Sequence, residues 1–122
     1  MKIFITGLAG MIGFHSAVHF SKLGWNVFGL DNFNNYYDVK LKRTRENILK
    51  SDFGIQVIDG DLREIHSYEN KIKECDLVIH LAAYANPRHS LAEPQHYIDT
   101  NITGTQRVVE LMEKLQLPII YA

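Results

Sequence analysis

The chain has 122 residues, of which 46% are hydrophobic and 22% are charged, and its formal net charge is -1 at pH 7. These values fit one globular domain with a core of ordinary size. A net charge so close to zero gives no electrostatic attraction for nucleic acid or for an anionic membrane, and we expect neither as a partner.

The cysteine content and the first residues bear on the compartment. A single cysteine, Cys75, excludes an intrachain disulfide and favours a reducing compartment. No apolar run is long enough to span a bilayer, and the start M-K-I-F-I-T-G leads directly into structure without a signal peptide. We therefore expect a cytoplasmic protein.

Residues 2–13, K-I-F-I-T-G-L-A-G-M-I-G, combine a short apolar strand, a glycine-rich turn and the start of a helix. Gly7 would allow the tight turn, Gly10 would let the backbone approach a pyrophosphate, and Gly13 would let the helix pack close to the strand. The free N–H groups and the positive dipole end of the helix would then face the anion. This stretch predicts a phosphate-binding turn.

The first helix is expected from Met11 to about Leu23, with Gly24 ending it. His15 and His19 lie one turn apart, but no third ligand is near them in the sequence, so no metal site is assigned.

The second strand, residues 25–30, ends at Asp31, which is 18 residues after Gly13. A carboxylate at about 20 residues from the glycine turn is suited to hold the 2′-hydroxyl of an adenosine ribose. Asp31 would repel a 2′-phosphate, and no Arg or Lys follows it before Lys40. The pattern favours NAD over NADP.

Residues 32–38, N-F-N-N-Y-Y-D, have no period and fit either a surface loop or the wall of the adenosine end of a dinucleotide site. Asp38 is placed to cap a helix over residues 39–50. This helix carries the basic residues Lys40, Lys42, Arg43 and Arg45. Because acids lie close by in the sequence, a solvated helix face is the favoured interpretation of this basic cluster.

A third strand is expected at residues 54–60, followed by Asp61, which fits a contact to the adenine edge and a helix cap equally well. A weakly predicted helical segment then extends to about Glu74. The apolar run 76–83 predicts a strand buried in a parallel sheet, with His80 as a core residue. Ala82 and Ala83 would leave room for a ligand at the carboxyl end of that strand.

Residues 84–90 are expected to form a loop, and Ser90 and Glu93 have the spacing of a capping box before Pro94. A long helix should follow. Its predicted apolar face consists of Ile98, Ile102, Thr105, Val108, Met112 and Leu115. The final run, L-P-I-I-Y-A, predicts a fifth strand.

Strands and helices thus alternate along the chain, which predicts the α/β class. We expect a Rossmann-like, doubly wound parallel sheet of about five strands in the order 3-2-1-4-5. Residues 1–122 would form one partial NAD-binding domain, with its crevice beside the first and fourth strands.

The motifs resemble those of the extended short-chain dehydrogenase/reductase family, in its NAD-dependent epimerase/dehydratase branch. T-G-L-A-G-M-I-G, G-D-L-R, H-L-A-A and N-I-T-G-T match the family's motifs in order. The segment D-N-F-N-N-Y-Y-D-V-K-L-K is most similar to UDP-glucuronate 4-epimerases. The family's usual A-G-V-R is A-N-P-R here, at residues 85–88.

The resemblance implies an NAD site and assigns residues to its parts. It implies Gly7, Gly10, Met11 and Ile12 for the pyrophosphate, Asp31 and Asn32 for the adenosine ribose, Asp61 and Leu62 for the adenine, and Leu81, Ala82 and Ala83 for the nicotinamide ribose. Asn101 would fix the architecture of the site, and Arg88 would approach a sugar nucleotide.

In the family, the fifth strand leads to a Ser/Thr and a Tyr-x-x-x-Lys motif and then to a UDP-sugar domain, whereas this sequence stops at Ala122. We expect the NAD-binding portion of a nucleotide-sugar epimerase, truncated before the catalytic residues and not catalytic alone. Two alternatives stay open, a stand-alone NAD-binding or assembly module and a fragment of a sugar-nucleotide 4,6-dehydratase. An uncovered fifth strand at a sheet edge predicts a homo-oligomer.

Overall fold

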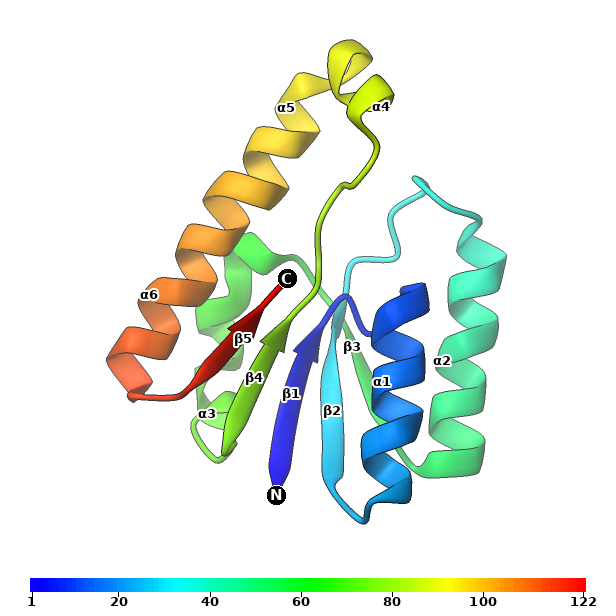
Figure 1. Cartoon of the computed structure of the whole chain (residues 1–122), viewed down its shortest axis with the longest axis vertical. Helices are drawn as coiled ribbons and strands as arrows, with labels where there is room; N and C mark the ends of the chain where they lie inside the picture. Colours follow the sequence, from blue (N-terminus) through cyan, green and yellow to red (C-terminus); the bar gives the residue numbers. More distant parts are fainter.

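The computed structural model describes residues 1–122, and its five strands form one parallel sheet in the order β3-β2-β1-β4-β5 (Figure 1). The predicted strand order is confirmed. The strands are β1 (Lys2–Thr6), β2 (Asn26–Asp31), β3 (Gln56–Asp59), β4 (Leu77–His80) and β5 (Ile119–Tyr121). Their carboxyl ends share one edge of the sheet, and the loops that follow them gather there.

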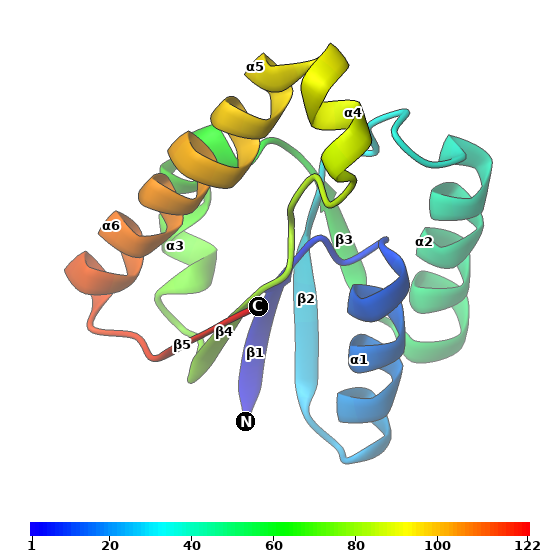
Figure 2. The same ribbon diagram turned by 45° about the horizontal axis from the view of Figure 1, so that its top comes forward.

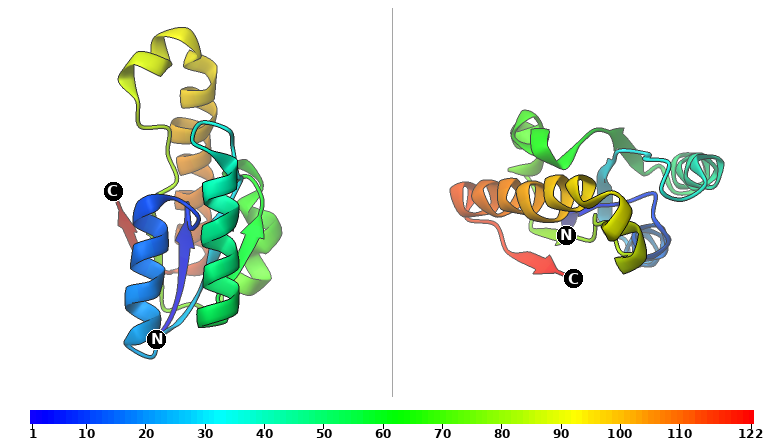
Figure 3. Two further views of the ribbon diagram at one scale, coloured as in Figure 1. Left: turned by 90° about the vertical axis from the view of Figure 1, so that its right-hand side faces the viewer. Right: turned by 90° about the horizontal axis from the view of Figure 1, so that it is seen from above.

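Helices connect the strands. They are α1 (Met11–Lys22), α2 (Val39–Phe53), the 3-10 helix η1 (Leu62–Tyr68), α3 (Glu69–Ile72), α4 (Pro87–Ala92), α5 (Pro94–Tyr97), the π-helical segment η2 (Ile98–Gly104) and α6 (Thr105–Leu115). Figures 1 and 2 show α4 and α5 beyond the carboxyl edge of the sheet, and Figure 3 shows α5, η2 and α6 running on as one continuous rod. No helix combines the length and the apolar character that crossing a bilayer requires.

The sheet is buried on both faces because successive side chains of a strand point to opposite sides. In β1, Ile3 and Ile5 pack in the cluster under α1 and α2, whereas Phe4 packs in the cluster with η1, α3 and α6. The thiol of Cys75 lies in the second cluster, and its burial raises the pKa of the thiol to about 11. The apolar runs of the strands therefore form two cores.

The turn between β1 and α1 needs glycine at two positions for different reasons. Gly7 has a φ of 74°, in the left-handed region that favours glycine, and a Cβ there would lie 3.0 Å from the Cα of Ala82. A Cβ at Gly13 would overlap the carbonyl oxygen of Gly7. These glycines thus bring α1 against β1 and bring the turn against the end of β4.

Several predicted boundaries are wrong. Helix α2 continues to Phe53 and ends at Gly54, which has the left-handed φ of 65° that suits a helix end. Strand β4 ends at His80, before residues 81–83. The expected loop 84–90 includes the start of α4, which Asn86 caps by accepting a hydrogen bond from the N–H of Arg88 at 3.0 Å.

The capping box predicted at Ser90 is also wrong. Ser90 lies inside α4, and its hydroxyl donates to the carbonyl of Pro87 at 2.6 Å. Pro94 does occupy the first position of α5, as predicted. The spacing of Ser90 and Glu93 therefore arose without a helix start between them.

The predicted apolar face of the long helix is right only after η2. Val108 and Met112 are buried, whereas Ile98 and Ile102 are exposed. A π-helical turn adds a residue to the turn, which rotates the preceding side chains by about 100° relative to the following ones. The isoleucines of η2 are therefore turned away from the core.

This change of register predicts a contrast between two substitutions. Leu111→Ala, at a fully buried position, should lower the free energy of unfolding by about 2–5 kcal/mol. Ile102→Ala, at a position 63% exposed, should change it by less than about 0.5 kcal/mol. Urea denaturation followed by circular dichroism measures both values, and equal losses would contradict the register.

Candidate functional site

A cleft of about 570 Å³ lies at the carboxyl edge of the sheet. Its walls come from the β1–α1 turn, the loop after β2, the first half of α2, the loop after β3 and the residues after β4. Among the residues predicted from the sequence, those that line it are Gly7, Gly10, Met11, Ile12, Asp31, Asn32, Asp61, Leu62, Leu81, Ala82 and Ala83. Arg88 and Asn101 do not line the cleft.

The β1–α1 turn forms the floor of the cleft. The N–H of Gly7 donates to the carbonyl of Leu30 at 2.8 Å, and the N–H of Gly10 donates to the carbonyl of Gly7 at 3.0 Å. No side chain caps the start of α1, where Met11 and Ile12 are exposed. An uncapped helix start beside a tight turn is suited to bind an anion such as a pyrophosphate.

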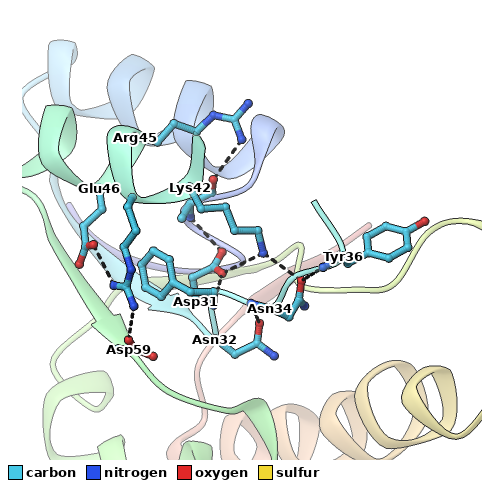
Figure 4. A network of polar contacts seen from close by, with 11 residues as sticks. Asp31, Asn32, Asn34, Tyr36, Lys42, Arg45, Glu46 and Asp59 are labelled. Carbon is cyan, nitrogen blue, oxygen red and sulfur yellow. Dashed lines mark hydrogen bonds and ion pairs between the residues drawn. The ribbon is translucent and has the colours of Figure 1, made fainter. Parts of the chain in front are cut away.

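The buried carboxylate of Asp31 connects the turn, the next loop and α2 (Figure 4). Its Oδ2 accepts the N–H of Ala9 at 3.1 Å. Its Oδ1 accepts the N–H of Phe33 at 2.9 Å and the ammonium of Lys42 at 3.3 Å. Asp31 therefore lies at the cleft with its position fixed from three sides.

The basic cluster on α2 is only in part the solvated face that the sequence predicted, because Lys40 is exposed whereas Lys42 is buried. The side chain of Lys42 is only 7% exposed and also donates to Asn34 Oδ1 at 3.2 Å. Arg45 reaches back to the carbonyl of Ala9 at 3.2 Å, and both cations line the cleft. The missed signal is periodicity, since Lys42 precedes the buried Leu49 by seven residues and so shares its face of the helix.

The loop of residues 32–38 is ordered by side chains that accept hydrogen bonds from the backbone two residues on. Asn32 accepts from the N–H of Asn34 at 3.1 Å, and Asn34 accepts from the N–H of Tyr36 at 3.3 Å. The ring of Tyr36 meets the ring of Tyr84, whose centroid is 5.3 Å away. The loop thus forms one wall of the cleft, and an aromatic contact joins it to the segment after β4.

Asp61 caps η1, as one of its two predicted roles required. Its Oδ1 accepts the N–H of Arg63 at 2.9 Å, and its Oδ2 accepts the guanidinium of Arg63 at 2.7 Å. These side-chain hydrogen bonds hold the pKa of Asp61 below its ordinary value. Because Asp61 also lines the cleft, the contact to adenine stays a prediction.

Comparison with known proteins identifies the family. The family model described as the NAD dependent epimerase/dehydratase family matches residues 3–122. The chain belongs to this family.

Two epimerases with solved structures and one relative from a plant illustrate the likeness. UDP-glucuronate 4-epimerase 1 of Arabidopsis thaliana is 40% identical over 113 residues, which are 91% of this chain and 26% of that protein. The crystal structure of UDP-glucuronic acid 4-epimerase from Bacillus cereus with UDP-glucuronic acid and NAD is 30% identical, with a TM-score of 0.89 over 99% of this chain and 39% of that chain. UDP-glucose 4-epimerase from Bifidobacterium longum with NAD⁺ and UDP is 27% identical, with a TM-score of 0.84 over all of this chain and 36% of that one.

The chain therefore spans between about a quarter and two fifths of the length of these relatives. Its Rossmann-like sheet corresponds to their N-terminal, NAD-binding part in this epimerase/dehydratase family.

Two residues implied by the resemblance lie outside the cleft. Asn101, within η2, accepts the N–H of Tyr84 at 2.9 Å and donates to the carbonyl of the same residue at 2.8 Å. This double hydrogen bond holds the segment after β4 against the helix, which is a positioning arrangement. Arg88 lies on α4 with an exposed side chain, so its approach to a sugar nucleotide stays a prediction.

His80 is a buried core residue whose tautomer follows from its neighbours. The hydroxyl oxygen of Thr6 accepts the N–H groups of Leu81 and Ala82, both at 3.1 Å. Its proton is then donated to His80 Nδ1 at 2.6 Å, so Nε2 carries the imidazole proton and donates it to Thr105 Oγ1 at 3.0 Å. Burial lowers the pKa of His80 to about 4, and the imidazole is neutral at pH 7.

The structure holds no group of three or more His, Cys, Asp or Glu side chains that could bind a metal ion.

The lowered pKa of His80 predicts acid sensitivity. Between pH 6.5 and 4 the unfolded chain binds a proton at His80 and the folded chain does not, so acid favours unfolding. The free energy of unfolding is unaffected by the protonation of His80 above pH 6.5. It falls as the pH drops from 6.5 towards 4, by up to about 3 kcal/mol. Urea denaturation from pH 7.5 to 4 measures this loss.

His80→Gln keeps a donor and an acceptor at the position and should flatten the pH dependence of unfolding. His15→Gln, at an exposed position, is the control and should leave that dependence unchanged. A parallel pH dependence in the wild-type chain and His80→Gln would contradict the assignment.

Proposed function

We propose that residues 1–122 bind NAD and serve as the cofactor-binding portion of a nucleotide-sugar 4-epimerase that acts on a UDP-hexuronate. The observation that carries the proposal is the open glycine turn at the uncapped start of α1, beside the buried Asp31, in a chain of the epimerase/dehydratase family. The relatives reported above are 4-epimerases, which supports this activity over a 4,6-dehydratase.

The residues of the cleft fit a dinucleotide. Gly7 and Gly10 leave the turn bare, so a pyrophosphate can approach the N–H groups of Met11 and Ile12. Asp31 retains acceptor capacity for a ribose hydroxyl, because three donors occupy only part of a carboxylate's four lone-pair sites. Asn32 would complete the ribose contact.

The two ends of the dinucleotide would lie on either side of this turn. Asp61 and Leu62, after β3, would contact the adenine. Leu81, Ala82 and Ala83, after β4, would line the path to the nicotinamide ribose, where small side chains leave space. Thr6 and His80 would position this second group by holding the backbone N–H groups of Leu81 and Ala82.

Bound NAD would supply reversible hydride acceptance from a sugar carbon. The residues of this chain would bind and orient the dinucleotide at the edge of the sheet. A base for the sugar hydroxyl is also required, and the family's Ser/Thr and Tyr-x-x-x-Lys motif would supply it after β5. We therefore expect residues 1–122 alone to bind the cofactor without epimerising a sugar, and to meet a UDP-sugar only together with the following half.

Titration with NAD⁺ by isothermal calorimetry tests the proposal. The wild-type chain should bind NAD⁺ saturably. Ala83→Trp places a large ring at the cleft wall and should raise Kd by at least about tenfold. Ala85→Trp, two residues further at an exposed position outside the lining, is the matched control and should leave Kd unchanged.

The absence of saturable binding to the wild-type chain would refute the proposal. Equal weakening by the two tryptophans would refute the location of the site.

The proposal also covers the compartment, the binding partners and the oligomeric state. We place the protein in the cytoplasm, with NAD as its partner and without nucleic acid or membrane as partners. We also propose that residues 1–122 in isolation form a homo-oligomer, because in this stretch the outer edge of β5 has no neighbouring strand and Ile120 and Tyr121 on it are 53% and 65% exposed.

Light scattering at high protein concentration tests the oligomer. The wild-type chain should have a mass above the 14.0 kDa of one chain, and Ile120→Lys should return it to that mass, because an edge lysine opposes strand pairing. Leu91→Lys, at an exposed position on α4, is the control. A monodisperse wild-type monomer would contradict the oligomer.

A further inference from the structure

Each acid at the ends of β2 and β3 near the cleft is paired with a cation. Asp31 pairs with Lys42 at 3.3 Å, Asp59 with Arg43 at 2.7 Å, and Asp61 with Arg63 at 2.7 Å. Because each of these three carboxylates lies beside a cation, together they add little net negative charge at this edge of the sheet. The expectation that Asp31 alone would repel a 2′-phosphate is therefore incomplete.

The Asp31–Lys42 pair differs from the other two in its burial and its place. Its side chains are only 4% and 7% exposed, and both residues line the cleft. Figure 4 shows the Lys42 side chain reaching across from α2 to Asp31 and Asn34. The charge of the pair is thus fixed at the point where the resemblance places the adenosine ribose, and solvent screens it weakly.

Hydrogen-bond capacity is left on both partners. An ammonium has three N–H donors, and Asp31 and Asn34 accept two of those of Lys42. A carboxylate has about four acceptor positions, and Ala9, Phe33 and Lys42 occupy three of those of Asp31. A ribose hydroxyl can therefore donate to Asp31 and accept from Lys42.

A phosphate at the same place would accept from Lys42 but could not donate to Asp31 when fully ionised. Three further charged residues line the cleft, namely Arg45, Asp38 and Asp61. Asp61 is paired with Arg63, and Arg45 and Asp38 balance each other formally. Selection between a hydroxyl and a phosphate thus depends on the Asp31–Lys42 pair rather than on an unopposed carboxylate.

We propose that Lys42 is a specificity-determining residue, which sets how strongly this site distinguishes NAD from NADP by neutralising Asp31. This inference rests on the proposed binding of NAD. With Lys42 in place, the site favours NAD by hydrogen bonding to the ribose and still admits NADP with a measurable affinity. Without the ammonium, the buried carboxylate of Asp31 would face the 2′-phosphate unopposed.

The test is the ratio of the NADP⁺ and NAD⁺ dissociation constants, measured by calorimetry on the same preparations at low and physiological ionic strength. Lys42→Met removes the charge and keeps an unbranched side chain, and it should raise this ratio by at least about tenfold. Lys42→Arg keeps the charge and should keep the ratio within about threefold of the wild-type value. Circular dichroism and thermal unfolding establish that each variant is folded.

Lys40→Met is the matched control, because it makes the same change of charge two residues earlier on α2, at an exposed position outside the cleft lining. It should leave the ratio unchanged. Asp31→Asn gives a second line of evidence that does not need Lys42→Met to fold. It leaves the ammonium without its carboxylate and should lower the NADP⁺ to NAD⁺ ratio by at least about tenfold.

Either of two results would overturn the inference while the proposed function stands, namely an unchanged ratio in folded Lys42→Met or an unchanged ratio in Asp31→Asn, each with NAD⁺ still bound by the wild-type chain. An equal change of the ratio in Lys40→Met would also overturn it, because the effect would then be a general one of charge. Failure of the wild-type chain to bind either dinucleotide would refute the proposed function and this inference together.

Discussion

The carboxylate of Asp31 receives three donors from three parts of the chain, and the geometry of the cleft depends on this convergence. The N–H of Ala9 comes from the glycine turn, the N–H of Phe33 from the following loop, and the ammonium of Lys42 from α2. Loss of one partner of a buried ion pair costs about 3–5 kcal/mol, because the remaining charge stays in a medium that solvates it poorly. The turn, the loop and the helix are therefore held as one unit around a single charge.

The opposite wall of the cleft depends on neutral hydrogen bonds. The side chains of Thr6, His80 and Thr105 connect the ends of β1 and β4 to the start of α6. This network orders the residues that follow β4, because the Thr6 hydroxyl also accepts the N–H groups of Leu81 and Ala82. The wall at Asp31 is thus held by a charged group, and the wall after β4 is held by hydrogen bonds between neutral side chains.

Much of this arrangement could be predicted from the sequence. The sheet order followed from the alternation of strands and helices, and the glycine turn and Asp31 followed from their spacing. These features are local, or they follow from rules of connection that apply to any parallel sheet.

The features that were missed depend on tertiary contacts. The charged neighbours of Lys42 in the sequence predict a solvated side chain, whereas its position on the helix turns it towards Asp31. The π-helical turn of η2 rotates Ile98 and Ile102 out of the predicted face, and no amino-acid preference in the sequence predicts such a turn. Asn101, within η2, makes two hydrogen bonds to the Tyr84 backbone, and these hold the segment after β4 beside η2.

The hydroxyl of Thr6 makes its position selective for chemistry rather than for size. Both of its lone pairs accept N–H groups and its proton is donated to His80, so every hydrogen-bonding function of the group is in use. Serine would preserve all three bonds in a smaller volume. Valine has nearly the same shape but would leave two N–H groups and an imidazole nitrogen without partners, at about 1–3 kcal/mol for each group. A residue that interrupts the apolar run of β1 is therefore one that an apolar residue of equal volume cannot replace.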